Sequence, residues 1–175
     1  MTQTQLTPAT ATATRTRTFS WSDPGLSSAQ VGAMSGLEFL RAITAGDLPK
    51  PPISCMLGMG RIDAGAGEVV VHLEPEEYHY NPLGSMHGGV MATLLDTATG
   101  CAVHSTLPAG YGYTSIDLTT KFLRPVTVAS GQLRCVGTVV SRGRRTALAE
   151  AKLTDAAGRL VAMATSSCLI FEIPR

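Results

Sequence analysis

The chain has 175 residues, with 14 Lys and Arg against 13 Asp and Glu, so its net charge at neutral pH is only +1. A chain of this length and charge can bury one sizeable hydrophobic core but has no strong field to recruit nucleic acid or an anionic membrane. No apolar run reaches the roughly 18 residues of a membrane-spanning helix. We therefore expect one cytoplasmic domain that binds neither nucleic acid nor membrane.

The N-terminal segment, residues 1–34, begins with a Thr- and Ala-rich stretch in which Asp23 is the first acid. Lack of acids is a feature of organelle transit peptides, but the stretch has no continuous apolar core such as a secretory signal needs. Its composition cannot bury much apolar surface. We expect residues 1–34 to be a disordered or extended tail and residues 35–175 to form the domain.

The first predicted helix begins at Ser35. The sequence Ser-Gly-Leu-Glu over residues 35–38 fits a capping box, in which the Ser hydroxyl and the Glu carboxylate bind free amides of the first turn. Apolar side chains then recur at helical spacing as far as Ile43, and Gly46 provides a stop.

Two strands are predicted next, over residues 54–62 and 68–73, with a Gly-rich turn over residues 63–67 between them. In the second strand apolar side chains occupy alternate positions, which is typical of a half-buried strand. Residues 76–86 are expected to form a loop.

Residues 87–104 predict a central, buried helix. The segment is apolar on most sides, so other elements must surround it. It is also rich in Gly and Ala, which allow a sheet or a second helix to approach closely.

Four strands are predicted after this helix, over residues 113–124, 132–140, 145–153 and 159–171, joined by short turns. The order of elements predicts an α+β fold. In it, a curved antiparallel sheet of about six strands wraps around the central helix, and an extra helix lies at the N-terminal side.

The four cysteines, Cys55, Cys101, Cys135 and Cys168, are widely spaced and form no Cys-x-x-Cys pair. No histidine lies near them at a metal-ligand spacing. This pattern is typical of reduced, mostly buried thiols in a reducing compartment. We expect neither a metal nor a cofactor.

The central helix carries one acid, Asp96, in a small-residue, apolar segment. An unpaired buried carboxylate is costly, so it needs a partner or a chemical role. His87, Gly88 and Gly89 open the helix, where the first amides have no internal acceptor and the helix dipole is positive. Such an end suits a polarised carbonyl, to which Asn81 could donate an additional hydrogen bond.

Asp96 lies eight residues beyond Gly88, which is about 12 Å along a helix axis, so one small reacting group cannot touch both residues of the same helix. If they cooperate, Asp96 must come from a second copy of the chain, as in a two-fold dimer with neighbouring antiparallel helices. The alternatives are structural: glycines that permit tight packing, Asn81 in a turn, and Asp96 as a hydrogen-bonded carboxylate at a dimer interface.

Three segments carry a resemblance to a known family: NPLGSMHGGVMATLLDTATG, YTSIDLTTKFLRPV and SRGRRTALAEAKLTDAAGRLVAMATSSCLIF. They resemble the hotdog-fold acyl-CoA thioesterases of the phenylacetate-degradation (PaaI-type) branch. The likeness covers about residues 53–171 and is strongest in the Asn, His-Gly-Gly and Asp pattern. It implies a hotdog fold and hydrolysis of an acyl-CoA thioester to a free acid and CoA.

The resemblance also implies roles for individual residues. The thioester carbonyl would lie at the start of the central helix, polarised by the Gly88 amide, with Asn81 holding the carbonyl or the attacking water. Asp96 from the partner subunit would act as general base or nucleophile. Ser115, or else Thr114, would orient water beside the acid.

Further substrate contacts are expected around these residues. The resemblance implies that His87 shapes the site rather than acting as a base, with Gly89 beside it. Arg142, Arg144 and Arg145 cluster in one turn, and Arg geometry suits the phosphates of CoA. The alternative for these arginines is a solvated, charged hairpin.

The chemistry independently favours these residue types. Thioester hydrolysis needs a base to activate water and a stabilised oxyanion, and a carboxylate in apolar surroundings is a better base. No G-x-S-x-G elbow is present, so a serine acyl-enzyme is not expected. We expect a homodimer or a dimer of dimers. Two alternatives stay open: a non-catalytic acyl-CoA binder or sensor, and a hydratase or dehydratase that uses His87 with the acid.

Overall fold

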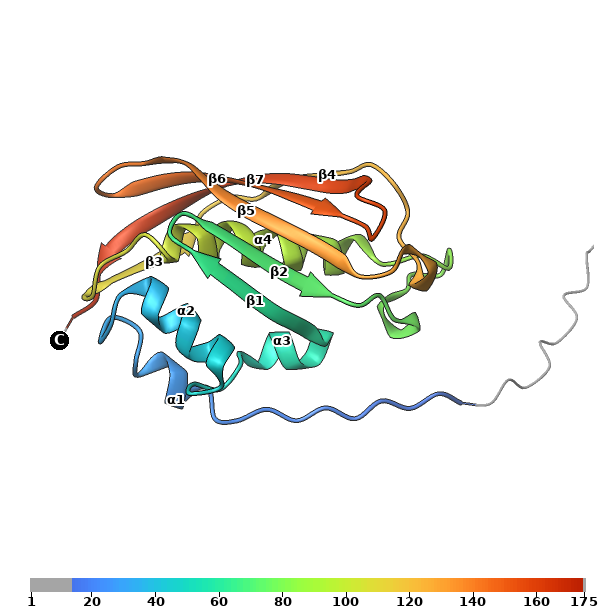
Figure 1. The fold of residues 1–175 in the computed structure, drawn as a ribbon, viewed down its shortest axis with the longest axis horizontal. Coiled ribbons are helices and arrows are strands. Elements are labelled where there is room, and N and C mark those ends of the chain that lie inside the picture. Colours follow the sequence, from blue (N-terminus) through green and yellow to red (C-terminus); the bar gives the residue numbers. More distant parts are fainter. Residues whose placement is uncertain (1–13, 175) are drawn as a thin grey trace, which may run out of the picture.

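The structure is a computed structural model that describes residues 14–174; the first part of the predicted tail, residues 1–13, lies outside them. Residues 14–23 contain no helix or strand and run as extended chain past the N-terminal helices (Figure 1). Arg17 ties this segment down by donating a hydrogen bond of 3.1 Å to the carbonyl of Cys55. The remaining N-terminal residues include a four-residue helix, α1 (Gly25–Ser28).

Within residues 14–174, seven strands form a single antiparallel sheet that curves around one long helix (Figure 1). Their order is β1-β2-β5-β6-β7-β3, and β4 also pairs with β7. This is the hotdog architecture that the resemblance implied. The other elements are α2 (Gly36–Ala45), α3 (Pro52–Leu57), β1 (Met59–Gly65), β2 (Glu68–Leu73), η1 (Glu77–His79), α4 (Gly88–His104), β3 (Tyr111–Ser115), β4 (Thr119–Phe122), η2 (Val128–Ser130), β5 (Leu133–Arg142), β6 (Thr146–Thr154) and β7 (Leu160–Glu172).

The capping box predicted at Ser35 is present. The backbone N–H of Ser35 donates to the Glu38 carboxylate at 2.9 Å, and the Ser35 hydroxyl oxygen accepts from the Glu38 backbone N–H at 3.4 Å. Gly46 ends α2 in the left-handed conformation, with φ of +88°, which a side chain would disfavour.

The prediction of a strand over residues 54–62 is wrong in its first half. Pro52 occupies the first turn of α3, where its fixed φ and missing N–H suit a helix start, and Gly58 ends the helix at φ of +68°. The strand begins only at Met59 and continues to Gly65, through most of the predicted turn.

The single strand predicted over residues 113–124 is interrupted. β3 and β4 both pair with β7, but the chain leaves the ladder between them. Asp117 explains the interruption, because its carboxylate accepts the backbone N–H of Ser167 at 2.9 Å and its backbone carbonyl accepts the Ser166 hydroxyl at 2.8 Å. This split accounts for seven strands where about six were predicted.

Helix α4 is buried on most sides, as predicted, and its packing depends on small residues. Leu94, Leu95 and Ala98 have no exposed surface. Strand β5 lies directly against the helix backbone, since a Cβ added to Gly137 would be 2.1 Å from the carbonyl oxygen of Ala98. The position of α4 is therefore fixed by backbone contact as well as by side chains.

Two further findings bear on the sequence analysis. All four cysteines are free thiols, with Cys135 and Cys168 buried and Cys55 and Cys101 half-buried. Among the described residues, no helix has both the length and the apolar character needed to cross a membrane.

Candidate active site

The start of α4 presents one amide that no described group uses. His87 is the N-cap residue, and its Nδ1 accepts the backbone N–H of Gly89 at 2.8 Å. Because Nδ1 is the acceptor, a neutral His87 ring carries its proton on Nε2. The N–H of Gly88 has no acceptor within residues 14–174. Of the two predicted glycines, Gly88 therefore has the amide that can still receive a ligand.

A second histidine, His79, holds the first one in place. Its side chain is buried, with Nδ1 accepting from the Glu76 N–H at 3.0 Å and Nε2 bonded to the Leu57 carbonyl at 2.9 Å. Its carbonyl in turn accepts the backbone N–H of His87 at 2.8 Å. Burial lowers the pKa of His79, so this ring is neutral at pH 7 and acts as a fixed spacer. Sequence reasoning missed His79, which lies in a predicted loop.

Asn81 forms a turn, as the structural alternative predicted. Its side-chain oxygen accepts the backbone N–H of Leu83 at 2.8 Å and, more weakly, that of Ser85 at 3.4 Å. Its amide nitrogen lies 3.4 Å from the Ser85 hydroxyl. Since this contact is long, the side chain can still donate to a ligand while its oxygen anchors the loop.

Asn81 and Gly88 line the same shallow pocket, which has a volume of about 350 Å³ and which we call the helix-start pocket. The ring of Phe122 covers one side, so close that a Cβ at position 88 would be 3.2 Å from its Cζ atom. Glycine at this position therefore leaves room for a group to reach the free amide.

Asp96 has the hydrogen-bond partner that its setting requires. The hydroxyl of Ser115 on β3 donates to Asp96 Oδ1 at 2.9 Å, and both side chains are half-buried. Oδ1 is therefore fixed, whereas no described residue donates to Oδ2. Thr114 is the exposed neighbour of Ser115, and its hydroxyl lies 3.5 Å from the Ser115 carbonyl oxygen.

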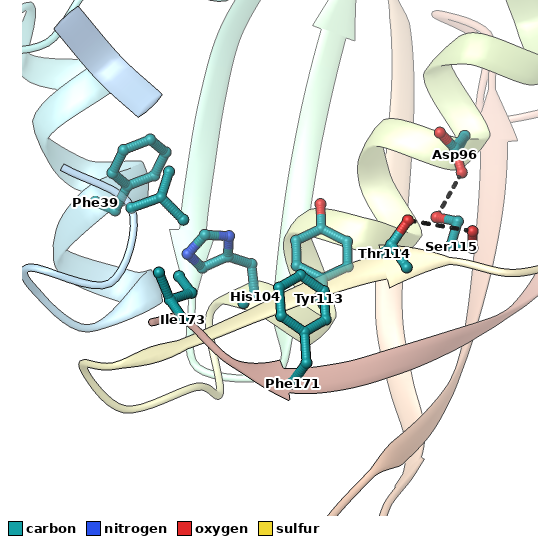
Figure 2. Close-up of a pocket in the computed structure, with 10 residues that line it drawn as sticks. Phe39, Asp96, His104, Tyr113, Thr114, Ser115, Phe171 and Ile173 are labelled. Atoms are coloured by element: carbon teal, nitrogen blue, oxygen red, sulfur yellow. Dashed lines mark hydrogen bonds between the residues drawn. The ribbon is translucent and has the colours of Figure 1, made fainter. Parts of the chain in front are cut away.

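Asp96 and Ser115 lie at one end of a larger cavity of about 560 Å³, which we call the acid pocket. Figure 2 shows Phe39 and His104 at the opposite end, with Tyr113 and Phe171 between. Sequence reasoning did not identify these four residues. They come from α2, α4, β3 and β7, and each is part of an apolar or aromatic pattern that is also typical of an ordinary core.

The predicted site residues thus fall into two separate groups within the chain. Gly88 and Asn81 line the helix-start pocket, and Asp96, Ser115 and Thr114 line the acid pocket. The two groups lie at different positions along the axis of α4, as the eight-residue spacing between Gly88 and Asp96 requires.

The three predicted CoA-binding arginines are exposed: Arg142 ends β5, and Arg144 and Arg145 lie in the turn that leads to β6. They form no ion pair within residues 14–174. The turn lies near the end of β3 that borders the acid pocket, because Thr146 and Thr114 both pair with Leu169. Within the same residues, no three His, Cys, Asp or Glu side chains gather to form a metal site.

Several known proteins are similar to this chain in sequence. Residues 83–162 match the family model described as the thioesterase superfamily. An esterase-related protein of Halobacterium salinarum is 33% identical over 124 residues, covering 66% of this chain and 82% of that protein. Human acyl-coenzyme A thioesterase 13 is 29% identical over 102 residues, covering 58% of this chain and 71% of that protein.

Solved structures also resemble the fold. A phenylacetic acid degradation-related protein from Ralstonia eutropha is 30% identical, with a TM-score of 0.67, covering 74% of this chain and 98% of that one. The Escherichia coli PaaI protein has the same TM-score at 23% identity and covers 81% of this chain and 96% of that one. At that identity the second likeness concerns the fold alone.

Proposed function

Because this chain belongs to the thioesterase superfamily and is a thioester hydrolase, we propose that it cleaves the thioester of an acyl-CoA to a free acid and CoA. The observation that carries the proposal is the pair of groups on α4: a free backbone amide at Gly88 and an oriented carboxylate at Asp96. Hydrolysis of a thioester needs one group of each kind. The name of the human relative supports the same substrate class.

The complete site would form between two subunits, with Gly88 and Asn81 of one protomer facing Asp96 and Ser115 of the partner subunit. Three observations support this arrangement. The two groups of one chain line different pockets. One face of α4 is only half-buried, at positions that include Thr93, Asp96 and Thr97. The sheet edge next to it exposes large apolar side chains, namely Ile116 (59%), Phe122 (50%) and Leu123 (49%).

The reaction follows from the groups available. The thioester carbonyl accepts hydrogen bonds from the Gly88 N–H and the Asn81 side chain, and the positive helix start favours the charge that develops on its oxygen. Oδ2 of Asp96 takes a proton from water while Ser115 holds Oδ1. The water oxygen bonds to the carbonyl carbon, and the tetrahedral intermediate then breaks its C–S bond. The CoA sulfur leaves and takes the proton from Asp96, which returns to its carboxylate form.

A direct attack by Asp96 on the carbonyl is the competing route, and it would give an anhydride intermediate. Single-turnover hydrolysis in ¹⁸O-labelled water separates the two routes. With Asp96 as base, the label appears only in the product acid. With Asp96 as nucleophile, water can open the anhydride at the Asp96 carbonyl, which places the label in the enzyme.

The remaining parts of the proposal concern binding and assembly. The exposed arginine cluster, Arg142, Arg144 and Arg145, would hold the phosphates of CoA, and CoA would enter only as part of the substrate, with no separate cofactor. We further propose a homodimer or a dimer of dimers located in the cytoplasm, where the four free thiols would stay reduced.

A mixing experiment tests the shared site. Purified wild-type protein should release CoA from a panel of acyl-CoAs, as detected with a thiol reagent. Asn81→Ala and Asp96→Asn should each be nearly inactive alone. When the two variants are unfolded and refolded together, half of the dimers are mixed and each has one intact site, so activity should recover to about a quarter of wild type.

This experiment distinguishes a wrong substrate class from a wrong assignment of the shared site. A lack of CoA release by the wild-type protein from every acyl-CoA would exclude the proposed substrate class. Recovery no greater than the sum of the two single variants would contradict the shared site, because every site would then draw both residues from the same chain.

A further inference from the structure

The acid pocket continues well beyond the reacting groups. Asp96, Gly100 and His104 occupy every fourth position of α4 and so share one face of the helix over about 12 Å. Tyr113 lies across this face, since a Cβ added to Gly100 would be 2.6 Å from its hydroxyl oxygen. The pocket therefore runs from the carboxylate, past the hydroxyl of Tyr113, to the imidazole of His104 (Figure 2).

The part of the pocket beyond the carboxylate contains polar groups without partners. His104 is only 7% exposed, yet within residues 14–174 neither of its ring nitrogens forms a hydrogen bond. The same is true of the Tyr113 hydroxyl. Burial lowers the pKa of His104 and raises that of Tyr113, so both groups are neutral at pH 7. Each lines the acid pocket and can donate or accept a hydrogen bond there.

Aromatic packing holds the imidazole in this position. The His104 ring stacks on Phe39 with 5.4 Å between centroids and an angle of 5°, and meets Tyr113 edge-on, also at 5.4 Å. Gly36 brings α2 directly onto the end of α4, because a Cβ there would be 1.9 Å from the His104 carbonyl oxygen. Its N–H donates to the Leu107 carbonyl at 3.0 Å.

Part of this end wall lies outside the residues that the family model matches. Phe39 and Val31 line the pocket from the N-terminal side, and Phe171 and Ile173 line it from the end of the chain. All four lie outside residues 83–162. His104 and Tyr113 lie within that match, so the far part of the pocket combines residues of the matched segment with residues from either side of it.

On the basis of the proposed hydrolysis of acyl-CoA, we infer that the acid pocket binds the acyl group and that His104 and Tyr113 hydrogen-bond a polar group at its far end. The substrate class is thus an acyl-CoA whose acyl group ends in a hydroxyl or keto oxygen. A plain hydrocarbon would desolvate both side chains without pairing them, which is costly. Sites built to bind a substrate hydroxyl discriminate strongly against the analogue that lacks it.

The test compares substrates that differ in one oxygen atom. The pairs are octanoyl-CoA with 8-hydroxyoctanoyl-CoA and 3-phenylpropanoyl-CoA with 3-(4-hydroxyphenyl)propanoyl-CoA. In at least one pair, wild-type kcat/KM should be at least tenfold higher for the hydroxylated member, equivalent to about 1.4 kcal/mol. A ratio near one, or below it, in both pairs would overturn the inference without any variant.

Variants then assign the preference to particular atoms. Tyr113→Phe removes only the hydroxyl, and His104→Phe keeps a ring that can stack on Phe39. Each should lower the ratio between paired substrates at least threefold. Tyr111→Phe is the matched control, because the Tyr111 hydroxyl lies two residues earlier on β3 and bonds Glu172 at the surface. It should keep the wild-type ratio, and an equal loss in this control would contradict the assignment.

Failure of the proposed function gives a different result from failure of this inference. If wild-type protein hydrolyses both members of each pair equally, the function holds and the inference fails. If it hydrolyses neither, calorimetric titration with the same pairs still decides the inference: tighter binding of the hydroxylated member supports it, and equal or absent binding overturns it.

Discussion

The first turn of α4 presents backbone amides to its pocket, whereas the middle of the helix presents a carboxylate. The amide of Gly88 is available in any helix that begins there, and neighbouring side chains only keep it clear. Asp96 depends instead on Ser115, a residue from another element, to fix its orientation. A substitution cannot remove the Gly88 amide but can block access to it with a new side chain. A substitution removes the Asp96 carboxylate directly.

The largest expected effect is at the carboxylate. Asp96→Asn keeps the shape and the contact with Ser115 but removes the base, so kcat should fall roughly 10²- to 10⁴-fold. Thermal unfolding should shift little, because the side chain is only half-buried. Asp63→Asn, on β1 and away from both pockets, is the control and should retain activity. An active Asp96→Asn enzyme would remove the carboxylate from the mechanism.

Blocking the amide should have the next largest effect. Gly88→Ala keeps the N–H but places a methyl group 3.2 Å from Phe122, inside the helix-start pocket. Loss of oxyanion stabilisation typically costs about 10²- to 10³-fold in kcat, and we expect the lower part of this range because Phe122 can shift. Gly65→Ala is the control, because Gly65 lies at the end of β1, away from both pockets, and a Cβ there would meet nothing closer than 3.4 Å.

Gly36→Ala tests the contact between α2 and α4. The added methyl group would overlap the carbonyl and ring of His104, and such overpacking costs about 1–3 kcal/mol. The free energy of unfolding from urea titration should fall by that amount. Substrate preference should change as well, because α2 carries Phe39. Unchanged stability would show that α2 does not need this close approach.

A smaller effect is expected at the helix cap. His87→Ala removes the acceptor for the Gly89 N–H, and loss of an N-cap typically costs about 1 kcal/mol. The Gly89 amide would then compete with Gly88 for the substrate carbonyl, so KM should change along with stability. His87→Asn restores a capping acceptor and should recover most of the lost stability, which a purely steric role for His87 would not allow.

The smallest effect is on the pH dependence of stability. Burial lowers the pKa values of His79 and His104 in the folded state, so the unfolded chain binds their protons more readily. Stability is fully present above the unfolded value of about 6.5 and is lost as the pH falls below it. The unfolding temperature should drop between pH 7 and pH 5, and His104→Phe should reduce this drop. An identical pH profile in the variant would exclude a contribution from His104.

Local sequence patterns were sufficient for the central helix, which is a long run of apolar and small residues, and for the start of α2, which has a capping box and helical periodicity. The Pro51-Pro52 pair and Gly58 carried an equally local signal for α3 that the strand prediction overlooked. The break after Ser115 had no such signal, since the pairing of Asp117 with Ser166 and Ser167 joins residues some fifty positions apart.

The residues of the candidate site also differ in how well the sequence alone could predict them. Asp96, Gly88 and Asn81 could be proposed because an acid in an apolar helix and a glycine pair at its start are unusual in themselves. His104, Tyr113 and Phe39 could not, because an aromatic or histidine beside apolar neighbours has the same pattern whether it fills a core or lines a cavity. Only the three-dimensional structure shows that these three side chains line the acid pocket.

Helix α2 packs directly on the end of α4 at Gly36, which leaves no room for a side chain. This contact places one wall of the acid pocket on a segment that precedes the residues matched by the family model. Gly88, Asp96 and Ser115 lie within the residues that match the thioesterase superfamily model, whereas Val31 and Phe39 of the acid pocket belong to the stretch that precedes them. Substitutions at Val31 and Phe39 should therefore change how the far end of the pocket fits an acyl group, while His104, Tyr113 and the reacting groups stay in place.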